Sequence, residues 1–583
     1  MKKALVLRVL AMLLALAPAL APAGIKVEIT GVEGDLRANV VTFLSVERSR
    51  ERKDIDKEMM TGLFNRIDRE VRSALRPFGF YEPVVKADFF GDEQEWRVKI
   101  DIEPGTPVMI TTVSVQVQGP GADDAAFDSA KHQTSLRPDT RLNHGVYEQV
   151  KGNLERTAAS NGYLRARLVR NEMRVDVAAK TAQIDLLLDT GPHYRFGAIN
   201  IEQAVIRPEL VKRFLRFHEG DPYSSTELLR TQFALDDSLY FSTVEVTPGD
   251  PDPVNLTVPV TITATKSTRQ FTIAGGYGTD TSVRGTLGWT DSRVNDRGHR
   301  LRVELTASAI KQRLDARYDI PIGDPALEKF SIEALIDDEK SGDLDTREYS
   351  VQPSITKVRG RWQYVYSVAA TSTTTLKGAE ESTSNLLVPG ITLASVPEGF
   401  LGEALFSRTL LIELIGSTKT LGSDSDFVRL HVQSERVFDI ADRWHLLTRA
   451  EMGAALVNNF DDLPGIYRFF AGGDRSVRGF GYNSLSPEEP VLQDNGTTRL
   501  EKTGGRYLLA GTVEFVRDLP HDLAAAVFFD VGNAFNNLGD PMEYSVGVGL
   551  RYRLPVVTLG MDIAQPLSSS GGPRLHLNIS PKL

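Results

Sequence analysis

The chain has 583 residues, a formal net charge of −10 and no cysteine. Its length predicts several domains. The negative charge argues against a nucleic-acid partner, because binding to phosphates requires basic surface. The lack of thiols excludes disulfides and cysteine-ligated metal sites.

The first residues have the pattern of a secretory signal peptide. A basic start precedes an apolar run over residues 9–16, and the triplet Ala-Pro-Ala at residues 21–23 fits a cleavage site. The apolar run is much shorter than the roughly 20 residues that a membrane-spanning helix needs. We therefore expect residues 1–23 to be removed on export, so that the mature chain begins at Gly24.

Three similar α/β segments fill the first half of the chain. Each has a helical pattern, then a turn with aromatic residues, then alternating strands. The equivalent turns lie at Gly79, Gly162 and Leu239, which are 83 and 77 residues apart. A repeat at nearly fixed spacing indicates tandem copies of one module. We expect the copies to span residues 24–104, 105–191 and 192–266.

The second half, residues 267–583, contains about 16 candidate strands, many of them with alternating side chains. In residues 269–278, for example, Phe271, Ile273 and Tyr277 fall on one face. Period-two alternation with one apolar face fits a soluble sandwich or a membrane barrel. The export signal, the even strand count and the long strands favour a 16-stranded antiparallel transmembrane β-barrel, because its closure leaves no unpaired edge in the bilayer.

One connection between predicted strands is far longer than the others. It covers about residues 458–505, whereas loops usually have about 4–6 residues. Its middle is rich in aromatic residues, which need to be covered, and the shelter that a barrel offers is its lumen. We therefore expect this loop to fold into the barrel.

The stretch FFAGGDRSVRGFGYNSLSP in this loop resembles the long-loop signature of the outer-membrane assembly superfamily, which includes BamA, TamA and the two-partner secretion transporters. The stretches GTVEF at residues 511–515 and FFDVG at residues 528–532 resemble the strand motifs that follow it in the family. The repeated modules resemble the family's POTRA domains. The resemblance implies a barrel in the outer membrane and POTRA modules in the periplasm. The three modules, the loop motif and the NISPKL ending are most similar to the TamA branch.

The loop motif and the strand alternation together give a candidate site. Its loop residues are Asp474, Arg475, Val477, Arg478, Gly479 and Phe480, and its wall residues are Glu514, Phe528, Asp530 and Gly532. By alternation Glu514 and Asp530 face the lumen, and one guanidinium can bond two carboxylates at once. We therefore expect Arg478 to hold the loop inside the barrel, and Asp474 and Arg475 to tie it to itself or to the wall.

The barrel is expected to close by pairing its first strand, about residues 269–278, with its last, about residues 573–581. Glycine weakens a strand and proline removes a backbone donor. We therefore expect a weak seam that opens to the bilayer and pairs with an incoming strand; the alternative is an ordinary closure whose glycines only permit curvature. The residues assigned to the seam are Gly275, Gly276, Gly278, Gly572 and Leu575.

No catalytic motif or metal-ligand cluster stands out, and the nine histidines are scattered. We therefore expect no enzyme activity, metal or cofactor. The resemblance implies a role in inserting or translocating client β-barrel proteins such as autotransporters, and the family is also linked to moving phospholipid to the outer membrane. It further implies a TamB-like partner, anchored in the inner membrane, that docks on the POTRA modules. The alternatives are a two-partner-secretion-type pore for one exported substrate, or a periplasmic tether that ends in an inert barrel.

Overall fold

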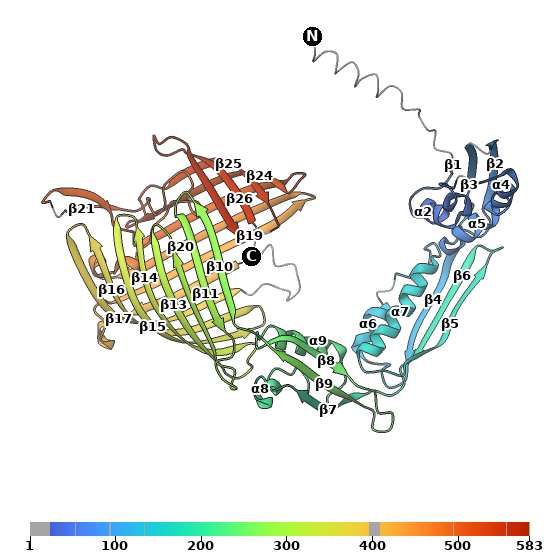
Figure 1. Cartoon of the computed structure of the whole chain (residues 1–583), viewed down its shortest axis with the longest axis horizontal. Coiled ribbons are helices and arrows are strands. Elements are labelled where there is room, and N and C mark those ends of the chain that lie inside the picture. The colour runs from blue at the N-terminus through green and yellow to red at the C-terminus, as the bar shows by residue number, and fades with distance from the viewer. Residues whose placement is uncertain are drawn as a thin grey trace, which may run out of the picture. The chain divides into compact units, whose positions relative to one another are not determined.

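The computed structural model describes most of the chain. The described residues are 24–52, 54–92, 95–132, 135–395, 409–493, 495–555 and 557–581, so the predicted signal peptide lies outside them. In chain order, three small three-stranded sheets with helices are followed by a closed barrel of 16 antiparallel strands (Figure 1). The fold class predicted from the repeat and the alternation is confirmed. No helix within the described ranges is long and apolar enough to cross a membrane.

The first module packs helices on a sheet whose middle strand comes last in sequence. Its elements are β1 (Gly24–Thr30), α2 (Gly34–Phe43), α3 (Ser45–Arg48), α4 (Lys57–Phe64), α5 (Ile67–Leu75), η1 (Arg76–Phe78), β2 (Val84–Asp92) and β3 (Glu95–Glu103). β3 runs parallel to β1 and antiparallel to β2. Along β3, Trp96, Val98 and Ile100 are buried and alternate with exposed residues, so one face of the sheet supplies the core. α5 buries Ile67 and Val71, four residues apart, in the same core.

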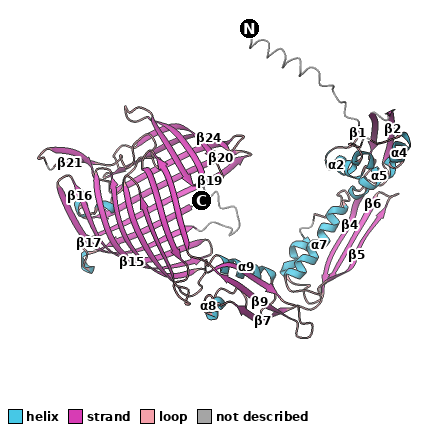
Figure 2. Ribbon diagram, viewed as in Figure 1, coloured by secondary structure: helices cyan, strands magenta, loops and turns pink. Residues whose placement is uncertain are grey.

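The second and third modules repeat this layout, again with the last strand in the middle of the sheet. The second comprises β4 (Met109–Gln118), η2 (Ala125–Phe127), α6 (Asp128–His132), α7 (His144–Ser160), β5 (Arg167–Asp176) and β6 (Thr181–Asp189). The third comprises β7 (Arg195–Glu202), α8 (Pro208–Lys212), α9 (Ser225–Asp236), β8 (Phe241–Pro248) and β9 (Thr257–Lys266). Figure 2 shows α7 lying along the sheet of the second module, where Tyr147, Val150 and Leu154 are buried.

The equivalent turns of the three modules share a left-handed backbone. The angle φ is +86° at Gly79, +83° at Gly162 and +60° at Leu239. Glycine adopts this conformation without a steric penalty, whereas leucine does not. The carbonyls of Gly79 and Gly162 also accept hydrogen bonds of 2.8 Å from the amides of Val108 and Tyr194, at the start of the next module. The repeated residue in the sequence therefore marks both a turn and a junction.

The barrel runs through 16 strands and closes between the first and the last. The strands are β10 (Gln270–Gly278), β11 (Ser282–Asp291), β12 (Arg300–Ala307), β13 (Lys311–Pro321), β14 (Glu328–Ser341), β15 (Leu344–Arg359), β16 (Trp362–Lys377), β17 (Glu380–Ser395), β18 (Thr409–Ser417), β19 (Phe427–Ala441), β20 (Trp444–Val457), β23 (Tyr507–Asp518), β24 (Leu523–Phe535), β25 (Glu543–Arg553), β26 (Val557–Pro566) and β27 (Arg574–Pro581). A separate hairpin, β21 (Glu488–Leu492) and β22 (Thr498–Lys502), belongs to the long connection after β20.

Side chains on the barrel strands alternate between the outer face and the lumen. Phe271 and Ile273 of β10 are 75% and 82% exposed, and Val527 of β24 is also exposed. Phe528 and Asp530, on the other face of β24, are buried. An apolar outer face around a polar interior is the pattern of a barrel that crosses a membrane.

Replacing Gly162 by alanine tests the junction between the second and third modules. A Cβ atom there would lie 2.9 Å from the backbone oxygen of Tyr223, on a residue with left-handed φ. We expect Gly162→Ala to lower the opening free energy of α7 by about 1–3 kcal/mol, measured by amide hydrogen exchange of the full chain. The control is Gly152→Ala inside α7, where the new Cβ has open space and should stabilise the helix by about 1 kcal/mol. Equal shifts in the two variants would show that the junction imposes no constraint.

Candidate functional site

The long loop between β20 and β23 packs against the inner wall of the barrel. Its residues Tyr467, Phe469, Ala471 and Val477 are buried. They form one apolar cluster with residues of the wall strands, among them Leu386, Val388, Phe427, Ala455, Leu508 and Ala534. Burial of this apolar surface favours the inserted position of the loop. The sequence predicted that the aromatic residues of the loop would be buried inside the barrel. Side chains of the inner wall bury them.

The guanidinium of Arg478 lies among carboxylates of the wall. Its Nη1 is 2.7 Å from Glu514 Oε2 on β23 and 3.4 Å from Asp562 Oδ2 on β26. Its Nη2 and Nε donate to the two oxygens of Asp530 on β24, at 2.8 Å and 2.9 Å. The guanidinium carbon lies 3.2 Å from the centre of the Phe528 ring. The side chain of Arg478 is only 3% exposed, so a buried cation is held by charge-assisted hydrogen bonds and by one aromatic face.

Asp530 is fully buried and its oxygens are saturated with donors. Besides the guanidinium, it accepts from the backbone amide of Arg478 at 3.1 Å, from Thr512 Oγ1 at 3.0 Å and from Ser545 Oγ at 3.3 Å. His576 Nε2 lies 2.6 Å from the carbonyl oxygen of Arg478. A buried charge is stable only when it is paired and hydrogen-bonded in this way. One loop residue therefore contacts side chains from β23, β24, β26 and β27.

Close backbone approach explains the glycines around Arg478. A Cβ on Gly479 would lie 2.7 Å from Ser545 Cβ and 3.0 Å from the backbone of Pro566. On the wall, a Cβ on Gly532 would lie 2.8 Å from Ala510 Cβ. A Cβ on Gly547 would lie 2.2 Å from the Phe528 ring. Only glycine leaves room for the loop at the wall and for the ring beneath the guanidinium.

The remaining motif residues hold the loop through backbone and apolar contacts. The amide of Asp474 donates to Asp280 Oδ2 at 2.7 Å, in the turn between β10 and β11. The side chain of Arg475 is 80% exposed and lies 3.6 Å from Glu435, and its carbonyl accepts from Arg449 at 3.2 Å. Phe480, which is half-buried, packs on the apolar cluster defined above. The loop is thus tied both to the turn after the first strand and to the last strands of the barrel.

Several members of this site were not identified from the sequence. Arg551 of β25 donates to Asp562 Oδ2 at 2.8 Å, and its Nη2 lies 3.6 Å from Glu514. The network therefore contains two guanidinium groups, Arg478 and Arg551, and three carboxylates. Strand alternation in β25 and β26 places Arg551 and Asp562 on the lumenal faces, and this signal could have found them. His576 and Asp280 required the closure of the barrel as well.

Two further arginines position the ends of the loop. Arg468 is buried and donates to the carbonyls of Leu463 at 2.8 Å and of Thr503 at 3.1 Å. Arg429 of the wall donates to the carbonyl of Tyr467 at 3.1 Å, and its guanidinium carbon lies 4.3 Å from the centre of the Phe469 ring. Beside this part of the loop is a polar lumenal cavity of about 830 Å³. The loop is therefore fixed along the wall and leaves part of the lumen open.

The seam between β10 and β27 is short. It has two ladder pairs, Tyr277 with Ile579 and Gly278 with Asn578. By contrast, β26 and β27 share eight pairs, and β10 and β11 share nine. The amide of Thr279 also donates to the carbonyl of Leu577 at 3.1 Å. Of the junctions that β10 and β27 form with their neighbours, the seam therefore has the fewest ladder pairs.

The register corrects part of the predicted seam. Gly278 pairs across it, and a Cβ on Gly276 would lie 2.7 Å from the carbonyl oxygen of Ile579. Gly275 lies opposite Gly285 of β11, and Leu575 lies opposite Ile563 of β26. Gly572 lies outside the strands, in the connection before β27. The pairing is offset because the end of β27 meets only the end of β10, which leaves residues 270–276 without a ladder partner on the described part of β27.

Comparisons with known proteins place this architecture in a family. A model of the Omp85 superfamily domain matches residues 266–580. A model described as POTRA domain TamA domain 1 matches residues 26–104, and a model described as surface antigen variable number repeat, a POTRA model, matches residues 194–265. Because the first match covers more than half of the chain, the chain belongs to the Omp85 superfamily.

The following relatives share a low fraction of identical residues with this chain. The outer membrane protein assembly factor BamA of Nitratidesulfovibrio vulgaris is 24% identical over 409 residues, which are 64% of this chain and 48% of that protein. The chain thus spans about half the length of this curated relative. BamA from Haemophilus ducreyi lacking POTRA domains 1–3 has a similar structure, with a TM-score of 0.65 and 15% identity over 81% of this chain and 100% of that one. CdiB from Acinetobacter baumannii gives a TM-score of 0.45 at 13% identity over 82% of this chain and 90% of that one.

Substitution of Arg478 tests the role of the buried cation. Arg478→Ala leaves Glu514 and Asp530 without their shared partner, and breaking a buried pair typically costs about 3–5 kcal/mol. We expect the barrel to insert but the loop to leave the wall, which limited proteolysis of the loop in membranes would detect. The matched control is Arg475→Ala in the same loop, where an exposed pair contributes at most about 1 kcal/mol. Equal protease resistance of Arg478→Ala and Arg475→Ala would refute this role.

Proposed function

We propose that the chain is the outer-membrane subunit of a TamA-type translocation and assembly module. In this role the barrel lies in the outer membrane and the POTRA modules lie in the periplasm. The protein helps to insert or translocate client β-barrel proteins such as autotransporters. The match of residues 26–104 to a model of the first TamA POTRA domain and the three tandem modules support this assignment. We further propose that the barrel opens at the seam between β10 and β27. The main support for this mechanism is that the seam has two ladder pairs.

The contacts of the loop suggest which side of the seam moves. The side-chain partners of Arg478 lie on the last strands of the barrel, whereas the amide of Asp474 binds Asp280 beside the first strand. Opening requires loss of the two ladder pairs and of the few contacts beside them. The loop then stays with β23–β27, held by the buried network. The freed edges of β10 and β27 present unpaired backbone groups, which an incoming client strand satisfies by β-augmentation.

The first module is the proposed docking point for a TamB-like partner anchored in the inner membrane. Its sheet has β1 and β2 as edge strands. β2 carries two exposed apolar residues, Val84 and Phe90. An exposed edge of this kind accepts a strand from another chain. The first module has its own core of buried residues, so it is a separable unit.

A disulfide across the seam tests lateral opening. The chain has no cysteine, and Tyr277 and Ile579 are a ladder pair on the outer face. Paired residues in antiparallel strands have Cα atoms about 4.5–5.5 Å apart, within disulfide reach. We expect oxidation of the Tyr277→Cys, Ile579→Cys variant to stop client assembly in cells and reduction to restore it.

The matched control for this crosslink uses the same residue of β27. The Leu559→Cys, Ile579→Cys variant joins β27 to β26, which is also a ladder pair on the outer face. It should form the disulfide and keep full client assembly, because this junction stays closed. Full assembly with the seam quantitatively crosslinked would eliminate lateral opening and favour passage through the lumen, as in a two-partner-secretion-type pore.

Deletion of residues 24–104 tests the docking point. We expect the shortened protein to lose capture of the TamB-like partner while its barrel keeps the heat-modifiable migration of a folded barrel. The reason is that the first module and the barrel have separate cores. The first module would be excluded as the docking point if the shortened protein still captured the partner. If a change in β7 of the third module abolished capture instead, the docking point would lie on the third module.

A further inference from the structure

A hydrogen bond between two side chains crosses the seam on the lumenal side of the barrel. Val283 of β11 is exposed on the outer face, so its neighbour Arg284 faces the lumen. Ile579 of β27 is also exposed, so Asn578 faces the lumen as well. Nη2 of Arg284 donates to Asn578 Oδ1 at 3.2 Å. This bond joins the second strand of the barrel to the last strand, and it passes over the first strand, β10.

The path of Arg284 over β10 requires a glycine. Arg284 lies directly opposite Gly276 in the ladder between β10 and β11. A Cβ atom on Gly276 would lie 2.9 Å from Arg284 Nε and 3.5 Å from its Cγ, so a side chain there would occupy the space that the arginine uses. The next lumenal position is Gly278, which pairs with Asn578 across the seam. The glycines that weaken this strand therefore also admit a contact that crosses it.

His576 of β27 makes a second contact across the seam. The residue is 3% exposed, and its Nδ1 lies 3.4 Å from Thr279 Oγ1 and 3.8 Å from Asp280 Oδ1, in the turn after β10. Its Nε2 lies 2.6 Å from the carbonyl oxygen of Arg478. Because a carbonyl only accepts, Nε2 carries a proton and Nδ1 is the atom that faces the turn. The long loop thus orients a ring that joins the last strand to the turn after the first.

All these contacts lie at one end of the seam. The two ladder pairs are formed by the last residues of β10, Tyr277 and Gly278. The amide of Thr279, in the turn that follows, also donates across the seam, to the carbonyl of Leu577 at 3.1 Å. Residues 270–276 have no ladder partner on the described part of β27. The seam is therefore held beside the turn, and the edge of β10 is unpaired along the rest of its length.

We propose that Arg284 and Asn578 form a lumenal clasp that sets how readily the seam opens. The inference rests on the proposed function, in which client strands enter at this seam. A hydrogen bond from a charged donor is stronger than one between neutral groups, so in a seam of two ladder pairs the clasp contributes a large part of the closure. A client strand first reaches the unpaired edge at residues 270–276. Release of the clasp then lets β27 move away, and the client strand extends along the whole of β10.

Amide hydrogen exchange in vesicles without a client tests the clasp independently of client assembly. The full chain is placed in phosphatidylethanolamine and phosphatidylglycerol vesicles, and the reporter is the Thr279 amide, which donates across the seam. Arg284→Ala should speed its exchange at least about tenfold, because a hydrogen bond from a charged group is lost. The matched control is Arg302→Ala, a lumenal arginine of β12 whose ion pair with Glu304 stays within one strand. Equal exchange of Thr279 in the parent and in Arg284→Ala would overturn the proposal.

Asn578→Asp separates the clasp from a general loss of packing. A carboxylate at this position keeps the acceptor oxygen and adds a charge, so it should bind Arg284 more tightly and slow the exchange of Thr279 several-fold. The same substitution in the Arg284→Ala background should not slow it, because the partner is gone. An equal effect of Asn578→Asp in both backgrounds would contradict the clasp, since the effect would not depend on the contact.

Client assembly in cells distinguishes failure of the clasp from failure of the proposed function. If client strands enter at the seam, Asn578→Asp should lower client assembly several-fold. Slower exchange of Thr279 with unchanged client assembly would support the clasp and refute entry at the seam. Unchanged exchange in both Arg284→Ala and Asn578→Asp would refute the clasp, whatever their effect on client assembly.

Discussion

The arrangement of loop, wall and seam depends on one buried cation. Removing a guanidinium from water is costly, and it is tolerated at Arg478 because Glu514, Asp530 and the Phe528 ring surround it. The dependence is mutual, since carboxylates that face one another across a narrow space repel when no cation lies between them. The loop and the last strands of the barrel therefore stabilise each other. The same loop reaches Asp280 beside the first strand, which connects the network to the seam.

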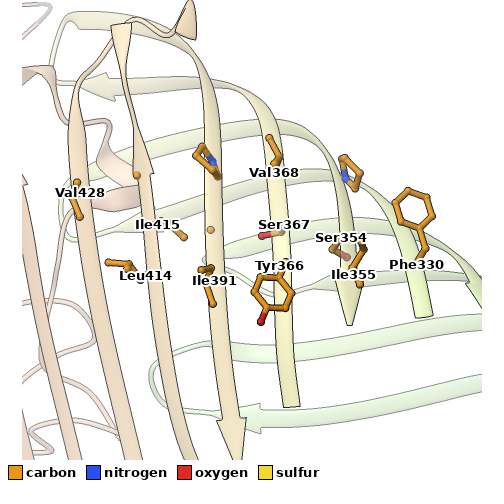
Figure 3. A pocket seen from close by; sticks show the side chains of 14 residues that line it. Phe330, Ser354, Ile355, Tyr366, Ser367, Val368, Ile391, Leu414, Ile415 and Val428 are labelled. Carbon is orange, nitrogen blue, oxygen red and sulfur yellow. The ribbon is translucent and has the colours of Figure 1, made fainter. Parts of the chain in front are cut away.

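The barrel wall is uneven around its circumference. Most neighbouring strands share long ladders, whereas β10 and β27 meet over two pairs. Opposite this weak junction, the ladder between β15 and β16 skips Pro353, and an apolar groove lies on the outer face of β14–β19 (Figure 3). In the proposed mechanism the side with the seam opens to client strands. On the lipid-facing surface an unpaired backbone group finds no water to bond, so missing ladder bonds are costly there.

Much of the fold could be predicted from the sequence because its signals are local. The turns at Gly79 and Gly162 need positive φ, and strand alternation places Glu514 and Asp530 in the lumen. The site as a whole depends on register, which is set by turn lengths and by the stagger of the closed barrel. For that reason His576 and Asp280 were missed. For the same reason Leu575 was assigned to the wrong neighbour, since it pairs with Ile563 of β26. The groove also follows from register and has no motif of its own.

In the proposed mechanism the loop moves as one unit with the last strands of the barrel. Amide hydrogen exchange of the full chain in vesicles measures whether it does. We predict that the amides of the loop around Arg478 exchange as slowly as those of β23 and β24. The amides of residues 270–276 of β10 that point toward the seam, and not toward β11, should exchange much faster, because they have no ladder partner there. Loop amides that exchange as fast as this edge of β10 would contradict it.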